Sequence, residues 1–152
     1  MILVTGATGF LGRSVVAALW EAGLPVAGTT SGRNSRYDLR TRTGMIDLLR
    51  DYQPTTVVHL AYPGTHGIAT MLEQPADLVS QMLEIDLRVI DACAKAKVHR
   101  LITMGSVCAY PKVIQRYPTD ESELWNGYPE TVNAGYGTAK RMQLELLRSY
   151  RR

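Results

Sequence analysis

The chain opens with a short apolar run that leads directly into a glycine-rich turn, and this junction limits the available folds more than any other feature. Residues 2–5 read Ile-Leu-Val-Thr, which is typical of a buried strand. Glycines follow at positions 6, 9 and 12, and an apolar helical pattern begins within the same stretch. A strand, a glycine turn and a helix in this order predict the first part of a βαβ unit.

Strand-like and helical patterns alternate along the rest of the chain. Strands are predicted at 2–5, 26–30, 37–39, 56–61 and 101–104, and the longest helix has an apolar stripe between residues 78 and 93. The last helix is predicted from about residue 134 to the end, with Ala139, Met142 and Leu146 on one face. This alternation predicts an α/β fold, a Rossmann-type doubly wound parallel sheet of about five strands in the order 3-2-1-4-5.

Length and composition fit one globular domain and exclude several classes of protein. The 152 residues carry a net charge of +3 with scattered basic side chains, which does not predict a nucleic-acid interface. The two cysteines do not form a disulfide framework, and no apolar run approaches the roughly 20 residues that cross a membrane. The N-terminus lacks a signal-peptide pattern. We therefore expect a cytoplasmic protein with no nucleic-acid or membrane partner and no metal site.

The glycine turn is the first candidate binding site. Glycine suits it because the turn is tight, the backbone must approach a pyrophosphate, and the helix must pack close to the strand. A plain strand–turn–helix corner would use the same residues. Ligands of such sheets bind at the carboxyl ends of the strands. The expected dinucleotide-binding residues are Gly6, Thr8, Gly9, Phe10, Leu11, Gly12, Asp38, Leu39, Leu60, Ala61, Met104 and Gly105.

The end of the second predicted strand indicates which dinucleotide is bound. A site that prefers NAD usually has a carboxylate about 20 residues after the glycine turn, where it binds the ribose hydroxyls. Here the segment has no carboxylate and contains Ser31 and Arg33, which suit a 2′-phosphate. We therefore expect NADP to be preferred over NAD. The alternative is that both side chains only solubilise a loop.

Tyr136 and Lys140 are four positions apart in the last predicted helix, so they project from one face. Tyrosine, with an ordinary pKa near 10, is a poor base at neutral pH, and a neighbouring ammonium favours its phenolate. Tyr136 can then exchange a proton with a substrate oxygen while Lys140 also contacts the cofactor. Taken alone, such a pair is usually a surface feature.

Ser106 and Cys108 follow the strand predicted at 101–104, at the edge where ligands bind. Ser106 can hydrogen-bond the reacting oxygen, and Cys108 can exchange a proton at a carbon next to a ketone. The alternatives are a turn residue for Ser106 and a small buried hydrophobe for Cys108. Cys93 lies on the apolar stripe of a helix and is predicted to be only such a hydrophobe. His59, inside an apolar strand, is predicted to be a core residue.

Together these motifs resemble the extended short-chain dehydrogenase/reductase family, the NAD-dependent epimerases and dehydratases. The likeness rests on the three glycines, on His59-Leu60-Ala61, on Ser106 and on Tyr136-x-x-x-Lys140. Within that family the chain is similar to the group of GDP-L-fucose synthases, chiefly along Gly-Ser-Val-Cys-Ala-Tyr-Pro-Lys at 105–112 and along 75–77 and 131–136.

The resemblance implies an NADP-dependent epimerase/reductase of a nucleotide-linked 4-keto-6-deoxy sugar, which is a homodimer when full-length. It makes Tyr136 the proton donor, Lys140 its partner and a cofactor ligand, Ser106 the orienting hydroxyl and Cys108 the acid/base of epimerisation. Alternatives are a sugar-nucleotide 4-epimerase and a non-catalytic dinucleotide-binding fragment. A 4,6-dehydratase is disfavoured, because such enzymes carry an Asp-Glu pair where Val107 and Cys108 stand.

Several features depart from the family pattern. Val107 stands where a small hydroxyl residue is usual, Gly135 where proline is usual, and Met82 near a usual asparagine. Family members are also longer. We therefore expect residues 1–152 to form one truncated NAD(P)-binding Rossmann domain that is incomplete at its C-terminal end, lacks the substrate domain and is inactive alone.

Overall fold

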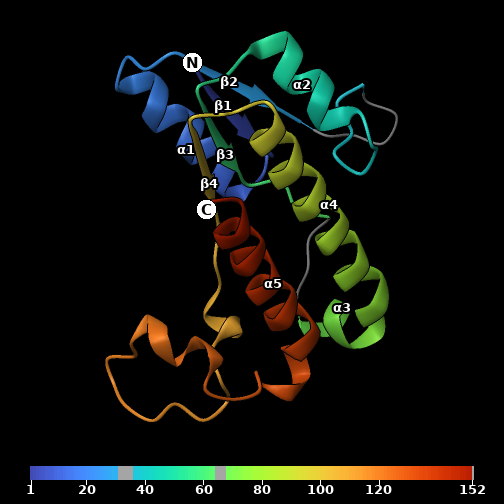
Figure 1. Ribbon diagram of the computed structural model, residues 1–152, viewed down its shortest axis with the longest axis vertical. Helices are drawn as coiled ribbons and strands as arrows, with labels where there is room; N and C mark the ends of the chain where they lie inside the picture. The colour runs from blue at the N-terminus through green and yellow to red at the C-terminus, as the bar shows by residue number, and fades with distance from the viewer. Residues whose placement is uncertain (31–35, 64–67, 152) are drawn as a thin grey trace. The chain divides into compact units, whose positions relative to one another are not determined.

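The computed structural model describes residues 1–30, 36–63 and 68–151 (Figure 1). The chain divides into two compact units, each of which is described by itself. The sheet unit comprises residues 1–62 and 84–104, and the α5 unit comprises residues 63–83 and 105–152. The long helix α4 (Pro75–Lys95) contributes residues to both.

The sheet unit is built on four parallel strands, β1 (Ile2–Thr5), β2 (Val26–Thr29), β3 (Thr56–His59) and β4 (Arg100–Thr103), in the order β2-β1-β3-β4. Leu3 pairs with Ala27 and Val57, and Val57 pairs with Leu101. The α/β class and the parallel sheet are confirmed. The predicted five strands and the order 3-2-1-4-5 are wrong in one element, because no strand forms at 37–39.

Helices cover both faces of this sheet. Leu3 and Val57 point to the face where α2 (Gly44–Tyr52) and the second half of α4 pack, and both side chains are 0% exposed. Helix α1 (Phe10–Glu21) contacts the opposite face, where a Cβ on Gly28 would meet Val16 at 3.5 Å. The alternation of side chains along each strand therefore sorts the helices into two layers.

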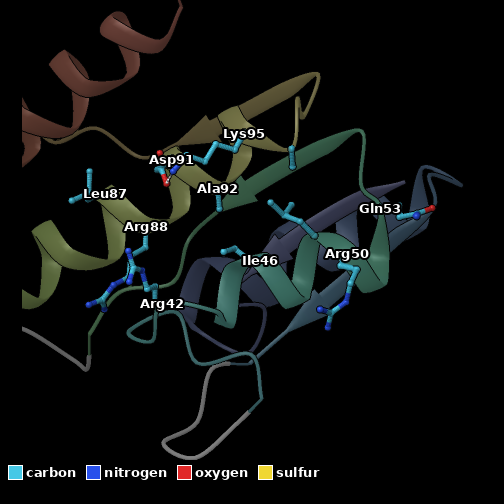
Figure 2. A pocket seen from close by; sticks show the side chains of 11 residues that line it. Arg42, Ile46, Arg50, Gln53, Leu87, Arg88, Asp91, Ala92 and Lys95 are labelled. Atoms are coloured by element: carbon cyan, nitrogen blue, oxygen red, sulfur yellow. Dashed lines mark hydrogen bonds and ion pairs between the residues drawn. The ribbon is translucent and has the colours of Figure 1, made fainter.

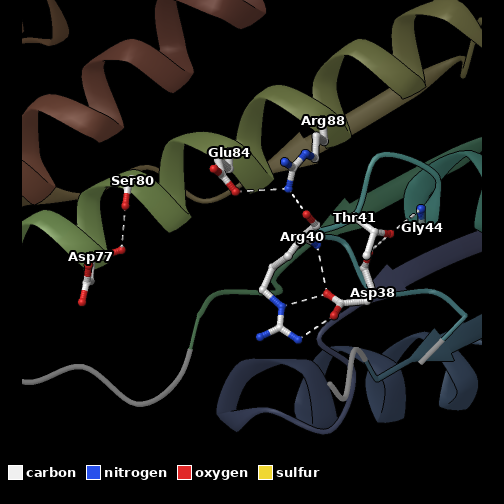
Figure 3. A network of polar contacts seen from close by, with 8 residues as sticks. All are labelled: Asp38, Arg40, Thr41, Gly44, Asp77, Ser80, Glu84 and Arg88. Atoms are coloured by element: carbon white, nitrogen blue, oxygen red, sulfur yellow. Dashed lines mark hydrogen bonds and ion pairs between the residues drawn. The ribbon is translucent and has the colours of Figure 1, made fainter. Parts of the chain in front are cut away.

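The segment predicted as a third strand is a turn, and Asp38 begins it (Figure 3). The Asp38 carbonyl accepts hydrogen bonds from the Thr41 amide at 2.9 Å and the Thr41 hydroxyl at 2.7 Å. Its carboxylate accepts from the Arg40 amide at 3.0 Å. An aspartate that bonds the amide two residues on favours a turn over an extended strand. Periodicity alone does not detect this competing interaction.

The α5 unit contains α3 (Ile68–Glu73), the first part of α4, three short 3₁₀ helices and α5 (Ala134–Tyr150). The 3₁₀ helices are η1 (Val107–Ala109), η2 (Glu121–Trp125) and η3 (Thr131–Asn133). The α5 face predicted to be apolar is only partly buried, because Met142 is 53% exposed. Polar side chains are buried on this helix instead: Lys140, Arg141 and Gln143.

The predicted stripe of the long helix is confirmed. Its five apolar residues are all at most 5% exposed: Leu78, Met82, Ile85, Val89 and Cys93. Among the helices of the described ranges, none is both long enough and apolar enough to cross a membrane.

Candidate functional site: a glycine turn and a Tyr–Lys helix

The glycine turn joins β1 to α1 and is as tight as the sequence predicts. Gly6 has a φ of +69°, and a Cβ there would lie 2.7 Å from the Ala61 backbone nitrogen. A Cβ on Gly12 would lie 2.1 Å from the Gly6 carbonyl oxygen. Both distances are far below van der Waals contact, so only glycine allows α1 to start this close to the end of β1. Leu60 and Ala61 are thereby brought against the turn.

The N-terminus of α1 has the character of an anion site. Gly9 is the N-cap residue, and no side chain caps the first amide groups of the helix. Phe10 is 87% exposed and Leu11 46% exposed at this end, whereas Gly12 is buried. Uncapped amides at the positive end of a helix dipole favour a negatively charged ligand. The backbone therefore fits a dinucleotide pyrophosphate.

Buried polar side chains support the turn from the sheet. The Thr5 hydroxyl lies 2.7 Å from His59 Nδ1 and accepts from the amides of Leu60 and Ala61, both at 3.3 Å. His59 is a core residue, as predicted, and its Nε2 faces Asp86 Oδ1 at 3.6 Å. Within the described residues, that nitrogen has no hydrogen-bond partner. This network ties the ends of β1 and β3 together behind the glycines.

Asp38 and Leu39 are 7% and 1% exposed. Arg40 donates to both carboxylate oxygens of Asp38, from Nε at 2.8 Å and from Nη2 at 2.6 Å. These hydrogen bonds hold the pKa of the Asp38 carboxyl below its usual value. Arg88 of α4 donates to the Arg40 carbonyl, so the turn is fastened to α4 within the sheet unit (Figure 3).

Four other cofactor candidates differ in how they are placed. Met104 is 44% exposed just beyond β4, and a Cβ added to Gly105 would meet nothing within 4 Å. Ser31 and Arg33 lie outside the described residues. The preference for NADP that rests on them stays a prediction.

The Ser106–Cys108 loop lies in the α5 unit, where Ser106 caps η1. Its hydroxyl accepts from the Cys108 amide at 3.2 Å, and both residues are partly buried. The two side chains predicted to act on substrate are thus held by one short turn. Cys93 differs sharply from Cys108: it is 2% exposed in the sheet unit, and burial raises the pKa of its thiol to about 12. Cys93 is the small core residue that its position on α4 predicts.

Tyr136 and Lys140 lie in the first two turns of α5. Tyr136 is partly buried, and Lys140 is 4% exposed, with its Nζ 3.4 Å from Gln143 Oε1. Helical spacing of four residues puts positions 136 and 140 on one face of α5, and the catalytic role of the pair stays a prediction.

Two further residues, which no sequence pattern indicates, hold the loop against this helix. A Cβ on Gly137 would lie 2.2 Å from the Cys108 carbonyl oxygen, so the close approach requires glycine. Arg141 donates from Nε to the Ala109 carbonyl at 2.6 Å. Their only sequence signal is their position, one residue after Tyr136 and one after Lys140. The structure therefore brings Ser106 and Cys108 together with the helix that carries Tyr136 and Lys140.

A hollow of about 730 Å³ lies elsewhere in the sheet unit, between α2 and α4 (Figure 2). Its floor includes Leu49 and Ala92, and three of its rim cations are paired within the chain, Arg50 with Asp47, Lys95 with Asp91 and Arg88 with Glu84. None of the residues predicted to bind cofactor or substrate lines it. Within the described ranges, no group of three or more His, Cys, Asp or Glu side chains is arranged to hold a metal ion.

Known proteins share this fold and these segments. A family model described as "NAD dependent epimerase/dehydratase family" matches residues 2–152. GDP-L-fucose synthase of Dictyostelium discoideum is 29% identical over 149 residues, which are 98% of this chain and 46% of that protein. The chain thus spans less than half the length of this curated relative.

Solved structures of similar proteins share the fold of this chain. A GDP-L-fucose synthetase from Naegleria fowleri superposes with a TM-score of 0.83 at 28% identity, over 99% of this chain and 44% of that one. A second structure of that synthetase is bound to NADP. A UDP-glucose 4-epimerase from Thermotoga maritima, solved with UDP-glucose, has a TM-score of 0.81 at 26% identity, over 98% of this chain and 50% of that one.

Proposed function

Since the chain belongs to the NAD dependent epimerase/dehydratase family, we propose that it is the NAD(P)-binding Rossmann domain of an NADP-dependent epimerase/reductase that acts on a nucleotide-linked 4-keto-6-deoxy sugar. The observation that carries the proposal is the docking of the Ser106–Cys108 loop on α5, the helix of Tyr136 and Lys140. A hydroxyl, a thiol, a phenol and an ammonium thereby belong to one unit. In this proposal the substrate domain lies outside residues 1–152, and the full-length enzyme is a homodimer.

The glycine turn and the strand ends would hold the dinucleotide. Uncapped amides at the start of α1 suit its pyrophosphate, and glycine at positions 6 and 12 allows α1 to start close to the end of β1. Ser31 and Arg33 would bind the 2′-phosphate, which makes NADP the preferred form. The Naegleria relative, which binds NADP, supports this preference.

The bound cofactor supplies the hydride that reduces the keto carbon. Tyr136 donates a proton to the carbonyl oxygen as that carbon is reduced, so the product is an alcohol. Lys140 keeps the phenol poised and contacts the ribose, and Ser106 hydrogen-bonds the same substrate oxygen. Before the reduction, Cys108 removes or returns a proton at a carbon next to the ketone, where the resulting carbanion is stabilised as an enolate. The carbon is inverted only when the other proton transfer takes place on the opposite face of the enolate, and in this proposal that second acid/base belongs to the substrate domain.

Cofactor preference tests the proposal directly on the 152-residue chain. Titration calorimetry with NADPH and NADH should show NADPH binding about tenfold or more tightly, because a phosphate gains charged hydrogen bonds from Arg33. Arg33→Asp should remove that preference, whereas Arg116→Asp, on an exposed loop, should not. Equal or reversed affinities for the two cofactors in the unmodified chain would refute the NADP assignment and favour the NAD-dependent 4-epimerase alternative.

A further inference from the structure

The face of α5 that receives the Ser106–Cys108 loop has two contact points, four residues apart. At Gly137 the helix backbone approaches the Cys108 carbonyl so closely that a Cβ would lie 2.2 Å from its oxygen. At Arg141 the guanidinium Nε donates to the Ala109 carbonyl at 2.6 Å. Successive carbonyls of the loop thus meet positions i and i+4 of the helix, which are neighbours on one face. The two contacts together fix where the loop lies along α5.

This register matters because each contact residue directly follows a candidate of the site. Gly137 comes after Tyr136, and Arg141 comes after Lys140. A shift of the loop by even part of a turn would move Ser106 and Cys108 along the helix relative to the phenol. Reactions that depend on proton transfer are sensitive to such displacements, since about 1 Å of misplacement can cost roughly 100-fold in rate.

Arg141 is placed unusually for a cation. Its side chain is 8% exposed, and its guanidinium carbon lies 5.6 Å from the centroid of the Trp125 ring. Within the described ranges none of the ion pairs includes Arg141, and its Nη2 has no hydrogen-bond partner. Burial of a cation without a counter-charge opposes folding, and an apolar side chain could pack against Trp125 without that cost. What the guanidinium adds is its hydrogen bond to Ala109 and a cation–π contact with the Trp125 ring.

We propose that Arg141 is a positioning residue, whose hydrogen bond to the Ala109 carbonyl holds the Ser106–Cys108 loop in register with Tyr136 and Lys140. The inference rests on the proposed function for the roles of those four side chains. Arg141 contacts the loop and Trp125, so it acts through the placement of other groups.

The two cysteines allow this to be measured without any substrate. Cys108 is partly exposed on the loop, and Cys93 is 2% exposed in the core of the sheet unit. Iodoacetamide treatment of the folded 152-residue chain, followed by mass spectrometry of the two cysteine-containing peptides, gives an alkylation rate for each thiol. Cys108 then reports the loop, and Cys93 reports general loosening of the chain.

Two substitutions separate the hydrogen bond from the packing. Arg141→Met keeps a long apolar stem against Trp125 but has no donor, whereas Arg141→Lys keeps a donor that can reach the carbonyl. We expect Arg141→Met to raise the alkylation rate of Cys108 about tenfold, because a charged hydrogen bond that closes the loop is lost. Arg141→Lys should stay within about threefold of the unmodified chain. Cys93 should react at an unchanged rate in both, and Arg148→Met, on the exposed side of the same helix, should leave both thiols unaffected.

Three results would overturn the proposal: an unchanged Cys108 rate in Arg141→Met, equal increases in Arg141→Met and Arg141→Lys, or a parallel increase at Cys93. If Arg141→Met does not fold, Arg141→Leu, whose side chain has no hydrogen-bond donor, takes its place with the same expectation. Failure of both to fold would assign Arg141 a purely structural role and also refute the proposal. A chain that binds no NADPH would remove the proposed function and leave this test of Arg141 intact.

Discussion

The pKa of Asp38 is set mainly by one neighbour, Arg40. Arg40 donates to both of its carboxylate oxygens, and this holds the pKa of Asp38 below its usual value. A carboxyl whose pKa is lower in the folded chain stabilises that chain fully above its unfolded pKa of about 3.9, and the contribution is lost as the pH falls. Asp38 therefore links the stability of the sheet unit to pH in the acidic range.

Asp38→Asn should flatten the acid side of the stability profile. We expect the free energy of unfolding of the unmodified chain to fall more steeply below about pH 4 than that of Asp38→Asn, because only the former takes up a proton at this site on unfolding. Urea denaturation at a series of pH values measures both. Arg40→Met should reduce the slope similarly, and the double variant should show no further reduction. Parallel profiles for all four proteins would contradict the linkage.

The proposed roles of Tyr136 and Lys140 can be distinguished by measuring NADPH binding. Tyr136→Phe removes only the phenol oxygen, so the NADPH dissociation constant should change by less than about threefold. Lys140→Met removes a cation proposed to contact the ribose, and we expect it to weaken NADPH binding about tenfold. Calorimetry on the two variants is a matched comparison within one helix. Equal weakening in both would show that the assigned roles are wrong.

At the scale of elements, the packing of the Ser106–Cys108 loop on α5 requires a residue without a side chain at position 137. Gly137→Ala would place a Cβ 2.2 Å from the Cys108 carbonyl oxygen, so helix and loop must separate. We expect a loss of about 1–3 kcal/mol in the free energy of unfolding, the usual range for overpacking. Gly105→Ala is the control, because a Cβ there meets nothing within 4 Å and should change stability by less than about 0.5 kcal/mol. Similar losses in both variants would argue against the close approach.

Elements defined by apolar periodicity could be predicted from the sequence. Helix α4 is buried along its predicted stripe. Strand β3 forms where predicted but ends at His59, two residues early, and buries only Val57 and His59. The strand expected at 37–39 does not form, because the Asp38 carboxylate accepts a hydrogen bond from the Arg40 amide and the segment makes a turn. The prediction of an apolar buried face on α5 was wrong in part, because Arg141 and Lys140 are buried with polar contacts. No apolar pattern reveals such contacts.

The candidate site was predictable only in part, for a related reason. Gly6, Gly12, Ser106 and Tyr136 were identified because each belongs to a spacing with a chemical meaning. Arg141 has no such spacing, and its contact with Ala109 joins positions 32 residues apart in the chain. Contacts of that kind depend on how a loop returns to a helix, and one sequence does not specify that path.

At the scale of the whole molecule, the chain carries all four catalytic candidates yet spans 46% of the length of the Dictyostelium relative. We expect residues 1–152 to bind NADPH but to show no turnover of a nucleotide-linked 4-keto-6-deoxy sugar. Positioning of the substrate supplies much of an enzyme's rate, and in our proposal the substrate domain is not part of this chain. Absorbance of the reduced cofactor, followed with purified chain and substrate, measures this. Turnover comparable to that of a full-length relative would refute it.

The close packing at Gly12 and Gly137 also limits which mutations the gene can accept. Glycine is the only residue without a Cβ, so every missense mutation at a glycine codon installs a residue with at least a Cβ. At Gly12 and Gly137 even that one carbon would lie 2.1 or 2.2 Å from a backbone carbonyl oxygen. No conservative replacement of glycine exists at either position, so neither residue can change without disturbing the packing. In a lineage released from selection, a single missense mutation at either codon would separate the helix from the segment it packs on.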